Sequence, residues 1–297
     1  MSVFVLKLIA VISMFIDHAS YVMRLAGHLP LRQIYIYGRA LGRPAFVIYC
    51  FLLVNGFDKT KDRKKYLSRL ILFAVVSQIP FTLAFTAGNY QGPGETLFSF
   101  DSLRAFLLLL PLFVYFLTVC GRRFDLSLCT LAAAFLFASV RLSIRGLCLL
   151  EQDDLNVFYT LAVSMAIMMS LDLLRSEERN WLHGFLILAA LAVELYFVQQ
   201  NADYGLLGVA LITGLYLCRS RKWLQIAVAA AWCLLEYRWC FTAQSIYLLY
   251  VAGALFALLP MALYNGRLGP KMRTFFYVFY PAHLALLGLV FVALSRR

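Results

Sequence analysis

Long apolar runs recur along nearly all of this 297-residue chain, and they restrict its fold more than any other feature. A transmembrane helix needs about 20 predominantly apolar residues, and stretches of that kind follow one another with only short polar connectors between them. Hydrophobic residues make up 63% of the chain and charged residues 14%, whereas a soluble domain carries roughly 25% charged residues. This composition excludes a soluble or secreted protein.

The apolar stretches predict an all-α, polytopic integral membrane helical bundle of about 10–11 transmembrane helices. No segment long enough for a soluble domain remains between them, so we expect one membrane-embedded domain over residues 1–297. The first stretch is interrupted by Asp17 and His18 and lacks a cleavage site, which indicates an uncleaved span. The count is ten if 125–140 or 203–219 is re-entrant. The expected spans are 3–23, 33–56, 66–87, 100–119, 125–140, 155–174, 181–198, 203–219, 222–239, 244–264 and 273–294.

Lysine and arginine collect in every second connector, and the densest group is the segment DKTKDRKKYLSR at residues 58–69. The positive-inside rule then places the N-terminus and the basic connectors in the cytoplasm. The net charge of +12 does not indicate a nucleic-acid partner, because these charges lie in short loops between spans rather than on one exposed face. The seven cysteines occur singly, without a CxxC pair, so we expect packing roles and no metal site.

Ionisable side chains inside a span are expensive, and each is therefore a functional candidate. Asp17 belongs to a polar stripe on one face of the first span, and His18 lies about 100° away around the helix. Arg39 and Arg43 share a face of the second span, and since guanidinium groups stay charged they need a carboxylate or an anionic ligand. Asp17 is the nearest candidate for that carboxylate, because it is expected at a similar depth in the membrane. The alternative is an Asp17–Arg43 ion pair that only locks two helices together.

Two further groups complete the candidates. Near the C-terminus Tyr280 and His283 share a helix face beside Pro281, a position where a helix kinks. In the basic connector, four residues can serve as a topology signal and a contact for anionic lipid. They can equally form a phosphate-binding rim for an acyl donor such as coenzyme A. These residues are Arg63, Lys64, Lys65 and Arg69.

Six segments in order along the chain carry a resemblance to a known family. They are LKLIAVISMFIDH (6–18), GRPAFVIYCFLLVNGFDKTKDRKKYLSRL (42–70), NVFYTL (156–161), ADYGLLGV (202–209), LLPMALYNGRLG (258–269) and FFYVFYPAHL (275–284). The chain resembles the TraX family, named for a conjugation-system protein that acetylates the amino terminus of pilin. Val47 stands where that family usually has proline. The resemblance also implies kinship with the broad membrane acyltransferase superfamily, whose turn before a basic stretch is similar to Asn55-Gly56-Phe57 here.

The resemblance implies a transferase of the bacterial cytoplasmic (inner) membrane. We expect an acyl-CoA-dependent acyltransferase that uses cytoplasmic acetyl-CoA. The acceptor would be an amine or hydroxyl of a pilin, another peptide or a small molecule at the membrane, and membrane lipids are further partners.

The candidate residues take distinct roles in such a reaction. His18, or otherwise His283, would be the general base, and Asp17 would orient or charge the site. Arg39 and Arg43 would stabilise the oxyanion or bind substrate groups, while the basic connector and Tyr280 would hold the donor. A transporter or flippase is the chief alternative, because buried ionisable residues also mark ion pathways. A non-catalytic membrane scaffold would leave these charges without a purpose.

Overall fold

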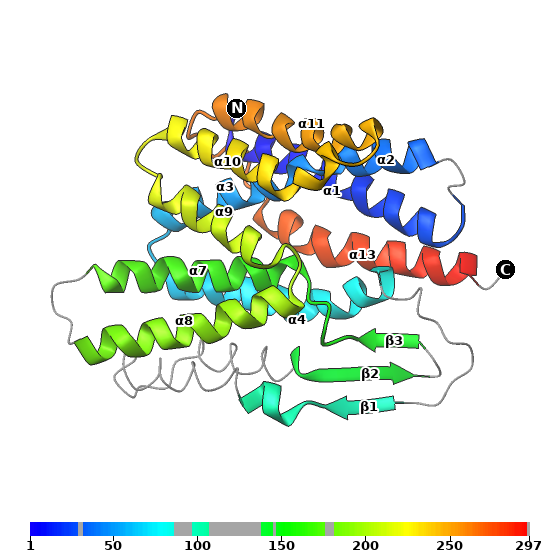
Figure 1. Ribbon diagram of the computed structural model, residues 1–297, viewed down its shortest axis with the longest axis horizontal. Helices are drawn as coiled ribbons and strands as arrows, with labels where there is room; N and C mark the ends of the chain where they lie inside the picture. Colours follow the sequence, from blue (N-terminus) through cyan, green and yellow to red (C-terminus); the bar gives the residue numbers. More distant parts are fainter. Residues whose placement is uncertain (29–31, 86–96, 107–137, 145–146, 176–180, 296–297) are drawn as a thin grey trace. The chain divides into compact units, whose positions relative to one another are not determined.

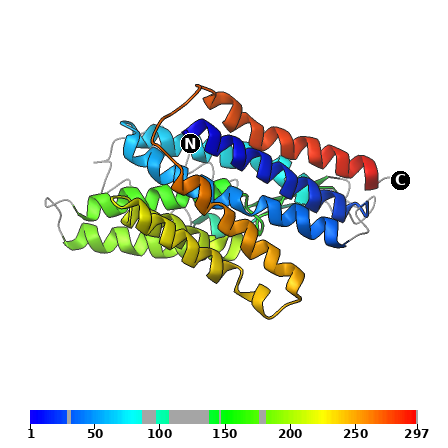
Figure 2. The ribbon, with the colours of Figure 1, turned by 90° about the horizontal axis from the view of Figure 1, so that it is seen from above.

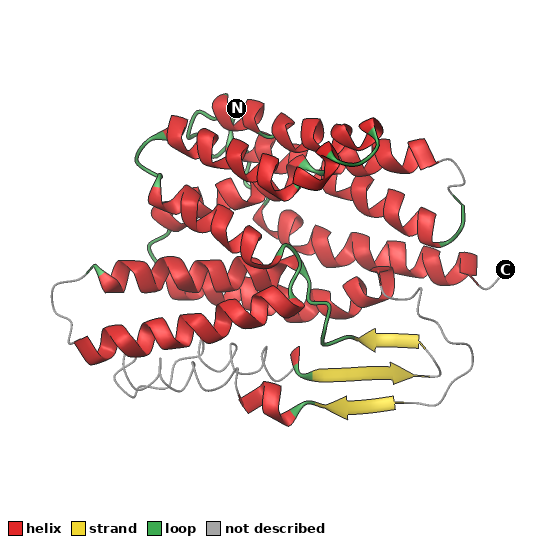
Figure 3. Ribbon diagram, viewed as in Figure 1, coloured by secondary structure: helices red, strands yellow, loops and turns green. Residues whose placement is uncertain are grey.

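The computed structural model describes residues 1–28, 32–85, 97–106, 138–144, 147–175 and 181–295, and these residues form helices and one small sheet (Figures 1 and 3). They fall into two compact units. The first unit comprises Met1–Asp58, Leu83–Gly88 and Ala210–Arg297. The second comprises Lys59–Thr82 and Asn89–Val209.

The first unit is a helical bundle. In it α1 and α13 run side by side (Figures 1 and 2). Its elements are α1 (Val3–Leu25), α2 (Arg32–Gly42), α3 (Pro44–Lys59), the end of α4, most of α9 (Gly205–Leu217), α10 (Lys222–Glu236), the 3-10 turns η2 (Arg238–Phe241) and η3 (Ser245–Tyr247), α11 (Leu248–Phe256), α12 (Leu258–Ala262) and α13 (Arg273–Ser295).

The span expected at 33–56 is divided in two at Arg43, between α2 and α3. Pro44 explains the break, because proline disfavours a helical conformation in the residue before it and is well suited to the first position of a new helix. Arg43 therefore lies at a helix boundary. The two helices together, Arg32–Lys59, are still long and apolar enough to cross a membrane as the one expected span.

Glycines on α2 allow α1 to approach closely. A Cβ atom built on Gly42 would lie 2.1 Å from the Cβ of Asp17, and one on Gly38 would lie 1.8 Å from the Oγ of Ser20. Two glycines four residues apart make a flat stripe on one helix face, which is a common device for tight packing of membrane helices. This close contact brings Arg39 of α2, and Arg43 directly after α2, within reach of Asp17.

The second unit contains most of α4 (Arg63–Phe85), then α7 (Val157–Leu174) and α8 (Trp181–Asn201). It also holds an antiparallel sheet in the order β1-β2-β3, built from Leu97–Phe100, Val140–Ile144 and Leu147–Leu150. The all-α fold expected from the sequence did not include these strands. These segments are four or five residues long. A strand this short gives too few alternating residues to be recognised within a chain of long apolar helices.

Five helical segments are long and apolar enough to cross a membrane, within the part of the chain that the structure describes. They are Val3–Leu25, Arg32–Lys59, Arg63–Phe85, Ser245–Ala262 and Thr274–Leu294, and the apolar helices Val157–Asp172 and Gly205–Leu217 are shorter. The expected helical, multi-pass membrane bundle is thereby confirmed. Most of the expected spans 100–119 and 125–140 lies outside the described residues.

Candidate active site

Asp17 bridges two arginines inside the first unit. Its Oδ2 accepts a hydrogen bond from Nη1 of Arg39 at 2.5 Å, and its Oδ1 accepts one from Nη2 of Arg43 at 2.7 Å. All three side chains are less than a fifth exposed. The predicted proximity of Asp17 to the arginines is confirmed, and it involves both of them rather than Arg43 alone.

The two guanidinium groups are held by further contacts on their other sides. Nε of Arg43 donates to the backbone carbonyl of Arg39 at 3.0 Å. Arg39 lies over the ring of Tyr21 at 5.1 Å, and Arg43 lies 5.4 Å from the ring centroid of Tyr250. Cation–π contacts of this kind are strongest where water is excluded. The arginines are thus fixed by neighbouring helices as well as by Asp17.

His18 and His283 form a hydrogen-bonded pair between α1 and α13. Nδ1 of His18 lies 2.9 Å from Nε2 of His283, and Nδ1 of His283 lies 2.8 Å from the carbonyl oxygen of Phe279. The two imidazole planes differ by only 12°, with centroids 5.1 Å apart. This is an edge-to-edge contact through the ring nitrogens, not a face-to-face stack. From the sequence, these histidines were alternative candidates for the general base, and the structure brings them together.

The protonation pattern of the neutral pair follows from these contacts. A carbonyl oxygen only accepts, so the hydrogen on His283 must be on Nδ1, which leaves Nε2 of that ring as an acceptor. Nδ1 of His18 then carries the hydrogen that it donates to His283. The lone pair of His18 is consequently on Nε2. Among the described residues, no hydrogen bond to this Nε2 atom is present.

Aromatic rings enclose the pair. The ring of Phe85 packs edge-on against His18 with the ring centroids 5.0 Å apart, and the ring of Tyr280 does so with the centroids 6.4 Å apart. Phe279 lies nearly parallel to His283 at 4.8 Å. Tyr280 is therefore beside the histidines, and its expected part in holding the donor stays a prediction. These rings restrict rotation of both imidazoles, since closely packed side chains cannot leave their rotamers freely.

The four basic-connector candidates belong to the second unit. Arg63 forms an ion pair with Asp172 at 2.6 Å, so part of its charge is already balanced. Nε of Arg69 donates to the carbonyl of Lys65 at 3.2 Å, and Lys64 and Lys65 are exposed. Their part in holding a donor stays a prediction.

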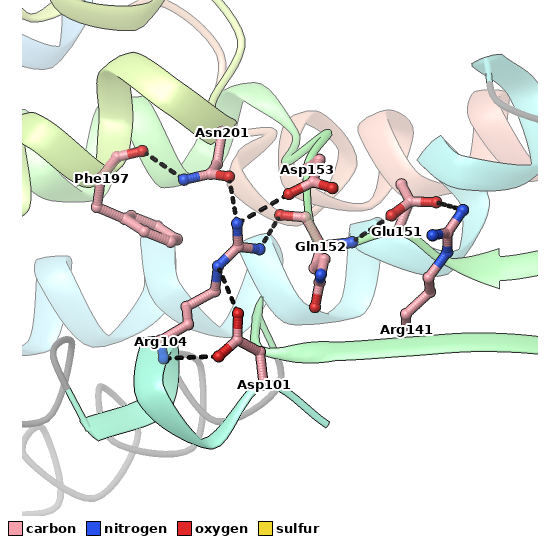
Figure 4. Close-up of polar contacts among 8 residues, drawn as sticks. All are labelled: Asp101, Arg104, Arg141, Glu151, Gln152, Asp153, Phe197 and Asn201. Carbon is pink, nitrogen blue, oxygen red and sulfur yellow. Dashed lines mark hydrogen bonds and ion pairs between the residues drawn. The ribbon is translucent and has the colours of Figure 1, made fainter. Parts of the chain in front are cut away.

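The second unit also contains a polar network around Arg104 (Figure 4). This guanidinium donates to the carbonyl of Gln152 at 2.9 Å, to Asp153 at 2.8 Å and to the side chain of Asn201 at 2.7 Å. Asp101 caps the helical turn that carries Arg104 through the backbone N–H, at 2.9 Å. These contacts join the end of β1 to the loop before α7 and the end of α8. Since Nη1 and Nη2 of Arg104 both have protein acceptors, we assign the network to stability.

Sequence reasoning missed Tyr237 and Tyr250, which contact Arg43. The alternation of charged and aromatic residues in EYRW, at the end of an apolar run, was the available signal. In the part of the chain that the structure describes, no group of three or more metal-ligating side chains is placed to hold a metal ion.

Comparison with known families adds a decisive finding. Residues 2–110 and 104–291 match the family described as TraX protein. The chain belongs to the TraX family. An 80-residue segment is also 38% identical to a protein named probable fimbrial assembly protein FimC, serogroup H1, from Dichelobacter nodosus. That segment covers 27% of this chain and 31% of the relative, so the match spans less than a third of the relative's length. No solved structure matches.

Proposed function

We propose that this TraX-family membrane protein is an acetyl-CoA-dependent acyltransferase that acetylates an amine or hydroxyl. The observation that carries the proposal is the Phe279 carbonyl–His283–His18 chain, which leaves the Nε2 lone pair of His18 as the basic atom. An imidazole with a fixed tautomer and a hydrogen-bonded second nitrogen has the arrangement expected of a general base.

In the proposed reaction, Nε2 of His18 takes the proton from the acceptor as its nitrogen or oxygen attacks the thioester carbonyl carbon. A C–N or C–O bond forms, and the carbonyl oxygen becomes an oxyanion. The C–S bond then breaks, and the imidazolium of His18 returns the proton to the CoA thiolate. His283 acts as a positioning residue, because its Nε2 accepts from Nδ1 of His18 throughout and stabilises the transient positive charge.

Arg39 and Arg43 are proposed to stabilise the oxyanion. A guanidinium has five N–H donors, and among the described residues Arg39 donates one of them, to Asp17, so Arg39 keeps donors to direct at a developing charge. Arg43 adds a second fixed positive charge beside it. One carboxylate between two guanidiniums also leaves this pair of ion contacts with a net positive charge. Fixed positive groups in a water-poor site are effective at stabilising negative charge in a transition state.

The donor and the orientation complete the proposal. Arg63, Lys64, Lys65 and Arg69 would face the cytoplasm and bind the nucleotide phosphates, with the protein in the bacterial inner membrane and its N-terminus inside. Labelling of cysteines introduced at Lys61 and Gln152 tests the orientation. Lys61→Cys should react from the cytoplasmic side only, and labelling of it from outside alone would refute the orientation.

The acceptor is proposed to be a pilin-like or other peptide, which the name of the fimbrial relative supports. The test uses purified protein in detergent with radiolabelled acetyl-CoA and a synthetic peptide whose amino terminus is free or blocked. Release of CoA together with label on the free peptide supports the proposal. Absence of CoA release, with uptake of a solute in proteoliposomes, would support a transporter instead.

A further inference from the structure

A cluster of four aromatic residues lies at the end of the first unit where α2 begins and α11 begins. Tyr237 and Trp239 come from the segment after α10, and Tyr247 and Tyr250 come from η3 and α11. The rings of Trp239 and Tyr247 are 5.3 Å apart, those of Trp239 and Tyr250 6.0 Å, and those of Tyr247 and Tyr250 5.7 Å. We call these four residues the aromatic cluster. They form one continuous packed group.

An arginine lies at each end of the aromatic cluster. At the buried end Arg43 contacts Tyr250. At the exposed end Arg32 lies 5.2 Å from the ring centroid of Tyr247 and donates to its hydroxyl at 2.5 Å. In the described part of the chain, Arg32 makes no ion pair with a carboxylate. Its guanidinium is therefore ordered by a ring and a hydroxyl, and no carboxylate among the described residues balances its charge.

The surface next to Arg32 is apolar. Ile34, Tyr37 and Leu41 follow at helical spacing on the outer face of α2, and they are 49–60% exposed. Trp239 is itself 46% exposed. In a membrane protein an exposed apolar helix face contacts lipid, and tryptophan, tyrosine and arginine side chains collect where the acyl chains give way to headgroups. The aromatic cluster is thus at the expected level of the membrane–water interface.

We propose that Arg32 and the exposed side of the aromatic cluster bind the phosphate of an anionic phospholipid. The guanidinium supplies paired N–H donors for phosphate oxygens, Trp239 and Tyr247 contact the glycerol region, and the outer face of α2 contacts the acyl chains. The occupant is a membrane lipid rather than a soluble anion, because the guanidinium of Arg32 lies directly beside an exposed apolar helix face. This inference does not depend on the proposed acetyl transfer.

Trp239 provides a direct readout. The protein is reconstituted in vesicles that contain a fixed fraction of brominated phosphatidylglycerol or brominated phosphatidylcholine, since bromine quenches nearby indole fluorescence. The Trp239 signal is the difference between the wild-type protein and Trp239→Phe. We expect brominated phosphatidylglycerol to be enriched beside Trp239 about fivefold, the factor that one basic residue contributes near an anionic headgroup, and to quench it correspondingly more.

Two arginine variants distinguish a specific site from general attraction. Arg32→Gln should bring the quenching by the two lipids to the same level. Arg267→Gln removes the same charge from an exposed residue at the other end of α1, where the backbone carbonyl of Arg267 accepts from Val3, and it should leave the difference unchanged. Equal quenching by both lipids in the wild-type protein, quenching by neither, or an unaltered preference in Arg32→Gln would each overturn the proposal.

Discussion

Asp17 pairs one carboxylate with two guanidiniums, so substitution of Asp17 should destabilise the first unit more than substitution of either arginine. Asp17→Asn would remove the carboxylate charge to which both Arg39 and Arg43 donate, and breaking a buried ion pair by removing one partner costs about 3–5 kcal/mol. Arg39→Gln should cost less, about 2 kcal/mol, because the Asp17–Arg43 pair at 2.7 Å survives it and only one charged hydrogen bond is lost.

The assay is thermal unfolding in detergent, followed by reaction of buried thiols with a fluorogenic maleimide. Cys50 and Cys233 are buried in the first unit and react only when it opens. For a chain of this size about 1 kcal/mol corresponds to roughly 2 °C, so Asp17→Asn should lower the melting temperature by about 6–10 °C.

A triple variant separates architecture from chemistry. Replacing Asp17 with leucine and both Arg39 and Arg43 with methionine removes all three charges together, and apolar replacement of a complete buried ion cluster is often neutral or stabilising. Its melting temperature should return close to that of the wild-type protein while acetyl transfer is lost. If Asp17→Asn is no more destabilising than Arg39→Gln, the shared-carboxylate account of this cluster is wrong.

Three further outcomes follow from other positions. Gly42→Ala should lower both stability and transfer, because the added methyl group would meet the Cβ of Asp17 at 2.1 Å, and an unchanged melting curve would contradict this packing. Arg69→Gln should raise the KM for acetyl-CoA severalfold with kcat nearly constant, whereas a fall in kcat alone would argue against a donor-binding role. Burial and the charge of Glu151 raise the pKa of Asp154, so its ionised form destabilises the folded state above that pKa. Asp154→Asn should therefore increase thermal stability at pH 7, with the gain vanishing below about pH 3.9, the carboxyl pKa in the unfolded chain; a constant gain across this range would refute the assignment.

The sequence predicted the charged part of the site better than the histidine part. Helical period and depth alone place Asp17 opposite Arg39 and Arg43, because a buried guanidinium must find a carboxylate. The same geometry correctly separated His18 from Asp17. It gave no means of pairing His18 with His283, since 265 residues separate them and apolar spans offer many equivalent ways of packing.

The remaining differences have local causes. Pro44 is a signal for a helix break that can be read from the sequence. The apolar run on both sides of it indicated a single span and gave no sign of where one helix ends and the next begins. The short strands between Leu97 and Leu150 depend on pairing between segments distant in the chain, which a periodicity argument does not capture. Close helix contact at Gly42 was likewise hidden, because a glycine in an apolar span fits many positions.

Single-turnover transfer of labelled acetyl groups tests most directly the proposed roles of His18 as the base and of His283 as the residue that fixes its tautomer. His18→Gln should reduce the rate by about 10²–10⁴-fold with CoA binding unchanged, because glutamine keeps the size and hydrogen bonding but cannot take the proton. His283→Gln retains an acceptor for Nδ1 of His18 and should lose less than His283→Leu. Near-wild-type transfer by His18→Gln, in protein that folds and binds CoA normally, would contradict the account.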